Sequence, residues 1–218
     1  MIRSVDEFIL YDDMQYTRRD WRNRNKIKTP QGTQWLTIPV EVKGKYFQAI
    51  KDTQTSDLDW SRQHWASLRQ NYSKALCFEQ YREVVESMYQ AIGEERHLSR
   101  VNYFFLIEIC KILDIDTKIS WSMDYARGDG KTERLVSLCK AAGATNYLSG
   151  PAARDYIVPA LFEEAGIQLE YMDYTGYPEY PQLWGEFDPY VTVFDLLFNV
   201  GRDFKKYLTR QSSETLDI

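Results

Sequence analysis

The sequence has 218 residues and a formal net charge of −5. A chain of this length can bury enough apolar surface to fold without disulfides, and its 44% hydrophobic and 27% charged residues are ordinary for a globular protein. The acidic balance argues against a general binder of nucleic-acid polymers, which needs a basic surface. The three cysteines form no CxxC pair, so no zinc site is expected. No apolar run approaches the length of a membrane span and no signal peptide is evident, so we expect a cytoplasmic protein.

The first predicted element is a short apolar strand, Phe8–Tyr11, of the kind that is buried on both faces in a parallel sheet. The stretch Thr17–Lys26 is dense in arginine and asparagine and is expected to be a loop. Trp35–Val40 is predicted to be a second strand, with Pro39 marking its end or a sheet edge. From about Trp60 to Gln90, apolar and aromatic residues recur at spacings of three and four, which predicts helix.

The second half of the chain alternates helices and strands. In chain order, we expect a helix at 103–113, a strand at 117–121, a helix at 131–142, a strand at 147–151, a helix at 152–165 interrupted near Pro159, a strand at 169–172 and a helix at 191–199. This alternation predicts right-handed βαβ units, and therefore a single α/β domain over residues 1–210 with a mostly parallel, Rossmann-like sheet flanked by helices. The polar tail, residues 211–218, is expected to be disordered.

Ligands of such sheets bind at the carboxyl ends of the strands, so the polar residues that follow strands are the first candidates. Two acids, Asp12 and Asp13, follow the first predicted strand. They are candidate catalytic residues, and they could bind a metal or orient a ribose or sugar hydroxyl. The residues after them could pair with phosphate through guanidinium groups and with hydroxyls through amides. The candidates for binding in this region are Gln15, Arg22, Asn23, Arg24 and Asn25. The alternative is a solvated loop with internal Asp–Arg pairs.

Only two histidines are present, so a proton shuttle at neutral pH is one of them or an unusual carboxylate, tyrosine or lysine. His64 lies four residues from Trp60 and from Leu68, and it is either a catalytic base or part of an apolar helix face. His97 follows three charged residues and is expected at the surface.

Two later segments could hold phosphate on backbone amides. The first is a glycine-flanked loop that leads into a predicted helix, with candidate residues Lys131, Thr132 and Arg134. The spacing of its glycines is not that of a P-loop. Thr132 could instead be a helix cap. The second runs from a strand into a turn and offers Ser149, Gly150 and Tyr156, or else is a plain structural turn. The polar ends of Asp195–Asn199 are interpreted as capping and packing.

Many of these segments form an ordered pattern from about residue 4 to residue 201. They are Ser4–Phe8, Tyr11–Tyr16, Trp21–Lys28, Gln34–Val40, Trp60 with His64, Asn71 with Tyr72, Lys131–Leu135, Tyr147–Gly150, Gly166 with Ile167, Tyr180–Gln182 and Asp195–Asn199. Together they resemble the WbqC-like protein family, which is associated with gene clusters for bacterial O-antigen and other surface polysaccharides. Family members open with a further strand and a His-Gln-Pro-type motif, which we expect to be missing before Ser4.

The resemblance implies a transferase that moves glycine or another acyl group to the amine of a nucleotide-linked amino sugar. In that scheme His64 takes the proton of the amine and the backbone amides at Ser149 and Gly150 stabilise the oxyanion. The diphosphate would be held by Arg22, Arg24 and Lys131, and the sugar hydroxyls by Asn23, Asn25, Asp12 and Asp13. Two alternatives stay open: an ATP-using ligase or nucleotidyl transferase, and a non-catalytic binding or scaffold protein. The sequence identifies no cofactor and no metal ligand set.

Overall fold

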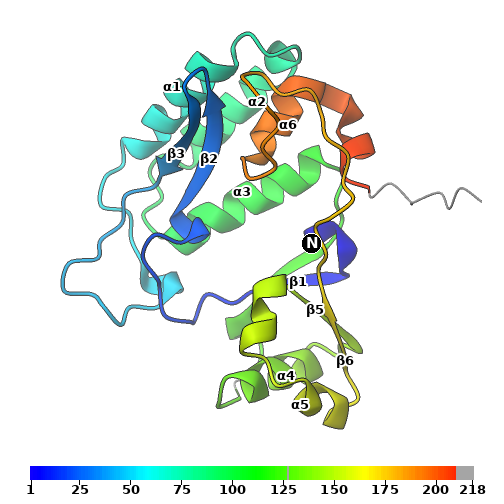
Figure 1. Cartoon of the computed structure of the whole chain (residues 1–218). Helices are drawn as coiled ribbons and strands as arrows, with labels where there is room; N and C mark the ends of the chain where they lie inside the picture. Colours follow the sequence, from blue (N-terminus) through cyan, green and yellow to red (C-terminus); the bar gives the residue numbers. More distant parts are fainter. Residues whose placement is uncertain (127, 210–218) are drawn as a thin grey trace, which may run out of the picture. The chain divides into compact units, whose positions relative to one another are not determined.

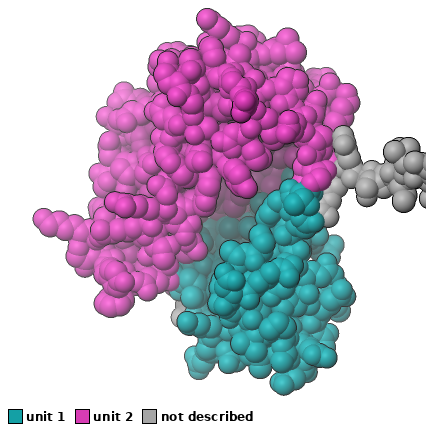
Figure 2. Space-filling view, in the orientation of Figure 1, with its two compact units in different colours: residues 1–14, 114–175 teal, residues 15–113, 176–218 magenta. Residues whose placement is uncertain are grey.

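The computed structural model describes residues 1–126 and 128–209, which form two compact units (Figures 1 and 2). Unit 1 combines Met1–Met14 with Asp114–Thr175, and unit 2 combines Gln15–Leu113 with the chain from Gly176 onward. Each unit is therefore built from two separate stretches of sequence. The single domain expected over residues 1–210 stays a prediction, and the tail expected at 211–218 lies outside the described residues.

Helices and strands both contribute to the fold, in agreement with the predicted α/β class. The helices are α1 (Trp60–Tyr72), α2 (Phe78–Ala91), α3 (Leu98–Ile112), α4 (Thr132–Ala141), α5 (Pro159–Glu164) and α6 (Val193–Val200). The strands are β1 (Glu7–Leu10), β2 (Arg24–Thr29), β3 (Gly32–Thr37), β4 (Lys118–Trp121), β5 (Asn146–Ser149) and β6 (Gln168–Tyr171). Short 3-10 helices, such as Trp21–Asn23 and Pro151–Asp155, connect several of them.

The strands pair two by two within the described residues: β1 with β4 in parallel, β5 with β6 in parallel, and β2 with β3 antiparallel. The parallel pairs lie in unit 1, as the alternation of strands and helices predicts. A single Rossmann-like sheet is not confirmed. In unit 1, α5 packs on β6 (Figure 1), and Phe162 stacks on the Tyr147 ring at 5.1 Å between centroids.

The prediction of a loop at Thr17–Lys26 is wrong from Arg24 onward, because β2 begins at Arg24 and forms a hairpin with β3. The register pairs Arg24 with Thr37 and Thr29 with Gly32. Strand formation in so polar a segment depends on pairing with the following strand, and local composition does not report that partner. The helix expected from 60 to 90 is two helices, with a break at residues 73–77 between α1 and α2.

Unit 2 is mainly helical, with α1, α2, α3 and α6 around one apolar core and the β2–β3 hairpin beside them (Figure 1). The most deeply buried large side chains of this unit include Trp60, Leu68, Phe78, Leu98 and Phe198. Aromatic rings meet within this core, with Phe78 and Phe198 at 5.0 Å between centroids. In the described part of the chain, no helix combines the length and the apolar character needed to cross a membrane.

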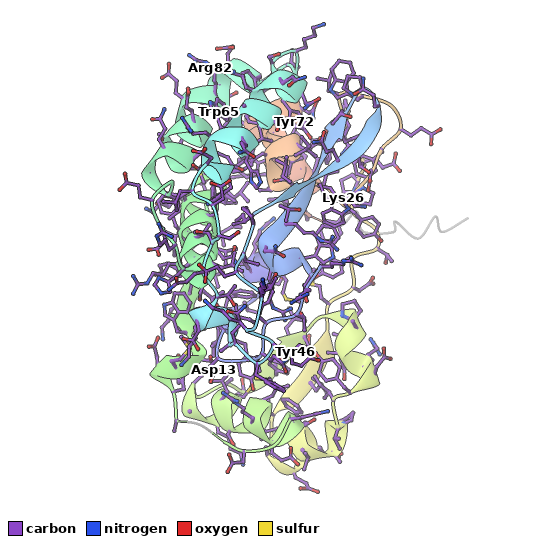
Figure 3. All side chains as sticks on the ribbon, turned by 90° about the vertical axis from the view of Figure 1, so that its left-hand side faces the viewer. Asp13, Lys26, Tyr46, Trp65, Tyr72 and Arg82 are labelled. Carbon is purple, nitrogen blue, oxygen red and sulfur yellow. The ribbon has the colours of Figure 1, made fainter. Side chains whose placement is uncertain are left out.

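A fully buried carboxylate, Asp195, lies at the start of α6 inside unit 2. The Tyr72 hydroxyl donates to its Oδ2 at 2.7 Å, and the Tyr180 hydroxyl donates to its Oδ1 at 2.8 Å. Figure 3 labels Tyr72 at the end of α1. The Tyr72 oxygen in turn accepts the backbone N–H of Lys28 in β2, at 2.9 Å. Burial raises the pKa of Asp195, and the two hydroxyls together with the Lys28 charge partly oppose that rise. This network joins α6, α1, β2 and the segment that precedes α6.

The Lys28 side chain is buried as well, at 4% exposure. Its ammonium donates to Gln182 Oε1 at 2.9 Å and to the backbone carbonyl of Glu186. A buried cation without such partners would be costly. Lys28 therefore fixes the segment that runs from Gly176 to α6 against the hairpin.

Replacing Asp195 with alanine removes the acceptor of two buried tyrosine hydroxyls and leaves the Lys28 charge without its counter-charge. We expect the Asp195→Ala variant to lower the free energy of unfolding by about 3 to 5 kcal/mol in urea titrations. The matched control is Asp203→Ala, which removes an exposed pair with Lys206 and should cost about 0.5 kcal/mol or less. Equal losses in the two variants would show that the network does not stabilise the unit.

Candidate functional site

Unit 2 contains a pocket of about 170 Å³ between the β2–β3 hairpin and the helices. Five residues selected from the sequence line it together: Arg22, Asn23, Arg24, Asn25 and His64. The remaining wall is aromatic and aliphatic and includes Trp60, Tyr89, Phe105, Ile38 and Phe194. The pocket therefore combines cationic and amide groups with an apolar interior, which is the usual composition of a small-molecule site.

The polar wall is held in place by the way the chain enters β2. A 3-10 turn, Trp21–Asn23, leads directly into the strand. Backbone N–H of Ile38 donates to the Asn23 carbonyl at 2.7 Å, and the Asn23 side-chain Nδ2 donates back to the Ile38 carbonyl at 2.9 Å. The side chain of Asn102 in α3 donates to the Arg22 carbonyl at 2.9 Å. These contacts fix Arg22, Asn23 and Arg24 relative to α3.

His64 projects from α1 into the same pocket and is 9% exposed. Its Nε2 lies 3.1 Å from the Thr37 carbonyl oxygen, which can only accept, so Nε2 carries the proton and Nδ1 of the neutral ring is an acceptor. The Trp60 ring packs edge-on against the imidazole at 5.2 Å between centroids. Burial lowers the pKa of His64 to about 4, against the opposing effect of the Thr37 hydrogen bond. The imidazole is therefore neutral at pH 7 and only weakly basic.

The two arginines of the pocket differ in their surroundings. Arg22 is 39% exposed at its side chain and pairs with Asp20. The Arg24 guanidinium lies 4.1 Å from the centroid of the Trp35 ring, and Trp35 also meets Trp21 at 4.9 Å. Stacking on Trp35 and a hydrogen bond to the Arg19 carbonyl hold the Arg24 guanidinium in position. An anionic ligand group would find an oriented cation here.

Unit 1 contains the second group of predicted residues. Asp13 follows β1, and its side chain is only 2% exposed. Its Oδ1 accepts the Ser122 hydroxyl at 2.7 Å, and its Oδ2 accepts a guanidinium N–H of Arg134. The Arg134 guanidinium lies 5.3 Å from the centroid of the Tyr11 ring. Because both carboxylate oxygens are bonded and covered, Asp13 is placed to orient Arg134 at the carboxyl end of β1.

The other predicted residues of unit 1 are dispersed in their environments. Thr132 is buried, and its hydroxyl accepts the Val158 backbone N–H at 3.2 Å, a contact that ties the start of α4 to the start of α5. Ser149 is buried at the end of β5, with Gly150 after it, whereas Lys131 is exposed and Tyr156 is 61% exposed. Asp12 is half-buried.

The predicted residues are thus divided between the two units, and five of them share the pocket of unit 2. Gln15 belongs to unit 2, where its side chain donates to the Tyr46 carbonyl at 2.9 Å, and it does not line the pocket. The sequence selection missed Asn102, whose amide interrupts the apolar pattern of α3 and could have marked it. Within residues 1–126 and 128–209, no three His, Cys, Asp or Glu side chains are grouped to hold a metal ion.

The depressed pKa of His64 links the pocket to stability. Below pH 6.5 the unfolded chain binds a proton at this residue and the folded chain does not, so folding loses stability as the pH falls from 6.5 toward 4. We expect this loss to reach about 3 kcal/mol and to be absent from His64→Gln, when the two proteins are compared by urea titration across that range. Parallel pH curves for the two proteins would contradict the buried neutral state of His64.

Comparison with known proteins identifies the relatives of this chain. Residues 1–207 match the WbqC-like protein family. The chain is 50% identical over 210 residues to "Uncharacterized protein Rv1507c" of Mycobacterium tuberculosis (strain ATCC 25618 / H37Rv), which covers 95% of this chain and 90% of that protein. No solved structure matches. The resemblance that the motifs indicated is confirmed, and the chain belongs to the WbqC-like protein family.

Proposed function

We propose that this protein is a transferase of surface-polysaccharide biosynthesis that binds a nucleotide-linked amino sugar and acylates its amine, for example with glycine. Membership of the WbqC-like family supports a role in that biosynthesis. The observation that carries the proposal is the pocket of unit 2, in which two arginines, two asparagines and a histidine share one wall. Such a set matches a ligand with an anionic diphosphate and hydrogen-bonding ring groups.

The size of the pocket limits which part of that ligand it holds. Small-molecule sites for larger ligands occupy roughly 300–1,000 Å³, and this pocket has about 170 Å³. One ring of the ligand therefore fits inside, while the diphosphate lies toward the exposed Arg22. Trp21, 53% exposed, offers an aromatic surface for the remainder.

In this proposal the amine nitrogen attacks the carbonyl carbon of an activated acyl donor. The C–N bond forms, the bond to the leaving group breaks, and the amine loses a proton. His64 is neutral and can accept a hydrogen bond through Nδ1, but a pKa of about 4 makes it a weak base. It acts as the general base only if a bound anion raises that pKa; otherwise it is a binding residue.

The two roles of His64 give different kinetics. We expect His64→Gln, which keeps a neutral amide in place of the neutral imidazole, to raise KM about tenfold with little change in kcat if the residue binds. A kcat that falls more than about a hundredfold, together with a rate that rises with pH through the His64 pKa, would identify the base. The measurement is steady-state acyl transfer across pH 5 to 8, followed by mass spectrometry of the nucleotide sugar.

The binding half of the proposal is tested separately with the arginine of the pocket. We expect Arg22→Gln to weaken binding of a nucleotide-linked amino sugar about tenfold, since one charge-assisted contact is lost, as measured by calorimetry. Arg82→Gln is the matched control (Figure 3), because Arg82 on α2 is similarly exposed and pairs with Glu79 outside the pocket. Equal binding by both variants would remove the pocket as the nucleotide-sugar site.

A further inference from the structure

Three buried polar atoms at the pocket lack a hydrogen-bond partner among the described residues. They are Asn23 Oδ1, Arg24 Nε and Trp60 Nε1, and the three residues that carry them line the same pocket. Trp60 is 1% exposed and Asn23 is 6% exposed. An unpaired buried polar group costs roughly 1 to 3 kcal/mol. A ligand that supplied the missing hydrogen-bond partners would remove this cost at all three atoms.

The chemistry of these atoms is fixed. The Asn23 Nδ2 donates to the Ile38 carbonyl, which can only accept, so the free atom Oδ1 is an acceptor. The Arg24 Nε–H and the Trp60 Nε1–H are always donors. The three unpaired atoms are therefore two donors and one acceptor.

The wall behind these atoms favours a flat, mostly apolar ring. Ile27, Ile38, Phe105 and Phe194 line the pocket together with Trp60. A cavity of about 150 Å³ accommodates one six-membered ring, and this pocket has about 170 Å³. A sugar ring carries hydroxyls around its whole edge, and a hydroxyl that faced these apolar side chains would be left without a hydrogen-bond partner, which is costly. A planar heterocycle with three polar groups on one edge fits better.

We propose that the pocket binds the imide edge of uracil or thymine. That edge presents a carbonyl, an N–H and a second carbonyl, so Asn23 Oδ1 would accept the N–H while Arg24 and Trp60 would donate to the carbonyls. The inference rests on the proposed function, because it names the nucleotide that carries the amino sugar. The three atoms are covered in this structure, so the base reaches them by displacing the wall side chains over them.

Other bases fail this match. The cytosine edge offers two acceptors and one donor group in a row, so its ring nitrogen would face the Asn23 oxygen without a hydrogen between them. Adenine and guanine present different patterns and a second ring. A site built to pair with a specific donor discriminates strongly against analogues that lack it, because its own buried groups are then left unpaired.

The test is calorimetric titration of the full chain with UDP, dTDP, CDP, ADP and GDP. We expect UDP or dTDP to bind at least about tenfold more tightly than the other three, and the ratio of UDP to dTDP identifies which base the site prefers. In Trp60→Phe this preference should fall to within about threefold. The matched control is Trp65→Phe (Figure 3), because the Trp65 N–H donates to Glu86 and neither residue lines the pocket. This variant should keep the preference for UDP or dTDP.

Four outcomes overturn the inference. Binding of all five diphosphates with similar affinity removes the base assignment and leaves the proposed nucleotide sugar intact. Preference for cytosine or a purine contradicts the hydrogen-bond pattern. A uracil or thymine preference that survives Trp60→Phe places the base elsewhere. Absence of binding by every diphosphate, and by the nucleotide-linked amino sugar, removes the proposed function together with the inference.

Discussion

The buried carboxylate of Asp195 is the contact on which unit 2 depends. It accepts the hydroxyls of Tyr72 and Tyr180, and through Tyr72 it reaches the backbone of β2. One negative charge thereby connects residues separated by 123 positions in the sequence. Without that charge, the buried ammonium of Lys28 would keep only its neutral partners, Gln182 Oε1 and the Glu186 carbonyl. The position of the hairpin relative to α1 and α6 follows from this network.

The pocket inherits its geometry from the same hairpin. Asn23 and Arg24 enter β2 directly, and Ile38 follows β3, so any shift of the two strands moves the polar wall. The Asp195 network and the pocket thus lie toward opposite ends of one strand pair: Lys28 belongs to the network, and Arg24 lines the pocket. Both carboxylate oxygens of Asp195 accept hydrogen bonds, whereas three buried polar atoms of the pocket-lining residues have no partner among the described residues. This distribution is expected when one part of the unit supplies stability and another keeps polar groups for binding.

Much of this organisation could be predicted from the sequence, but unevenly. Apolar periodicity located most helices and the strands of unit 1, because those patterns are local. The clustering of Arg22, Asn23, Arg24 and Asn25 marked the pocket wall although the segment itself was expected to be a loop. His64 was selected because histidines are scarce, whereas its low pKa depends on burial by Trp60 and Tyr89, which no local pattern reports. Asp195 was interpreted as capping and packing, and its role depends on two tyrosine hydroxyls, one of which is 123 residues away in the sequence.

The division of the chain into two units has a consequence for synthesis. The chain passes from one unit to the other at residues 14–15, 113–114 and 175–176. As the polypeptide leaves the ribosome, β1 emerges first but pairs with β4, which emerges more than a hundred residues later. Unit 1 can be completed once β6 has emerged, while unit 2 still lacks Asp195 and its helix. Until α6 follows, the Tyr72 hydroxyl lacks the Asp195 carboxylate, so the buried network of unit 2 cannot be completed before this last part of the chain is made, although most residues of the unit precede β6.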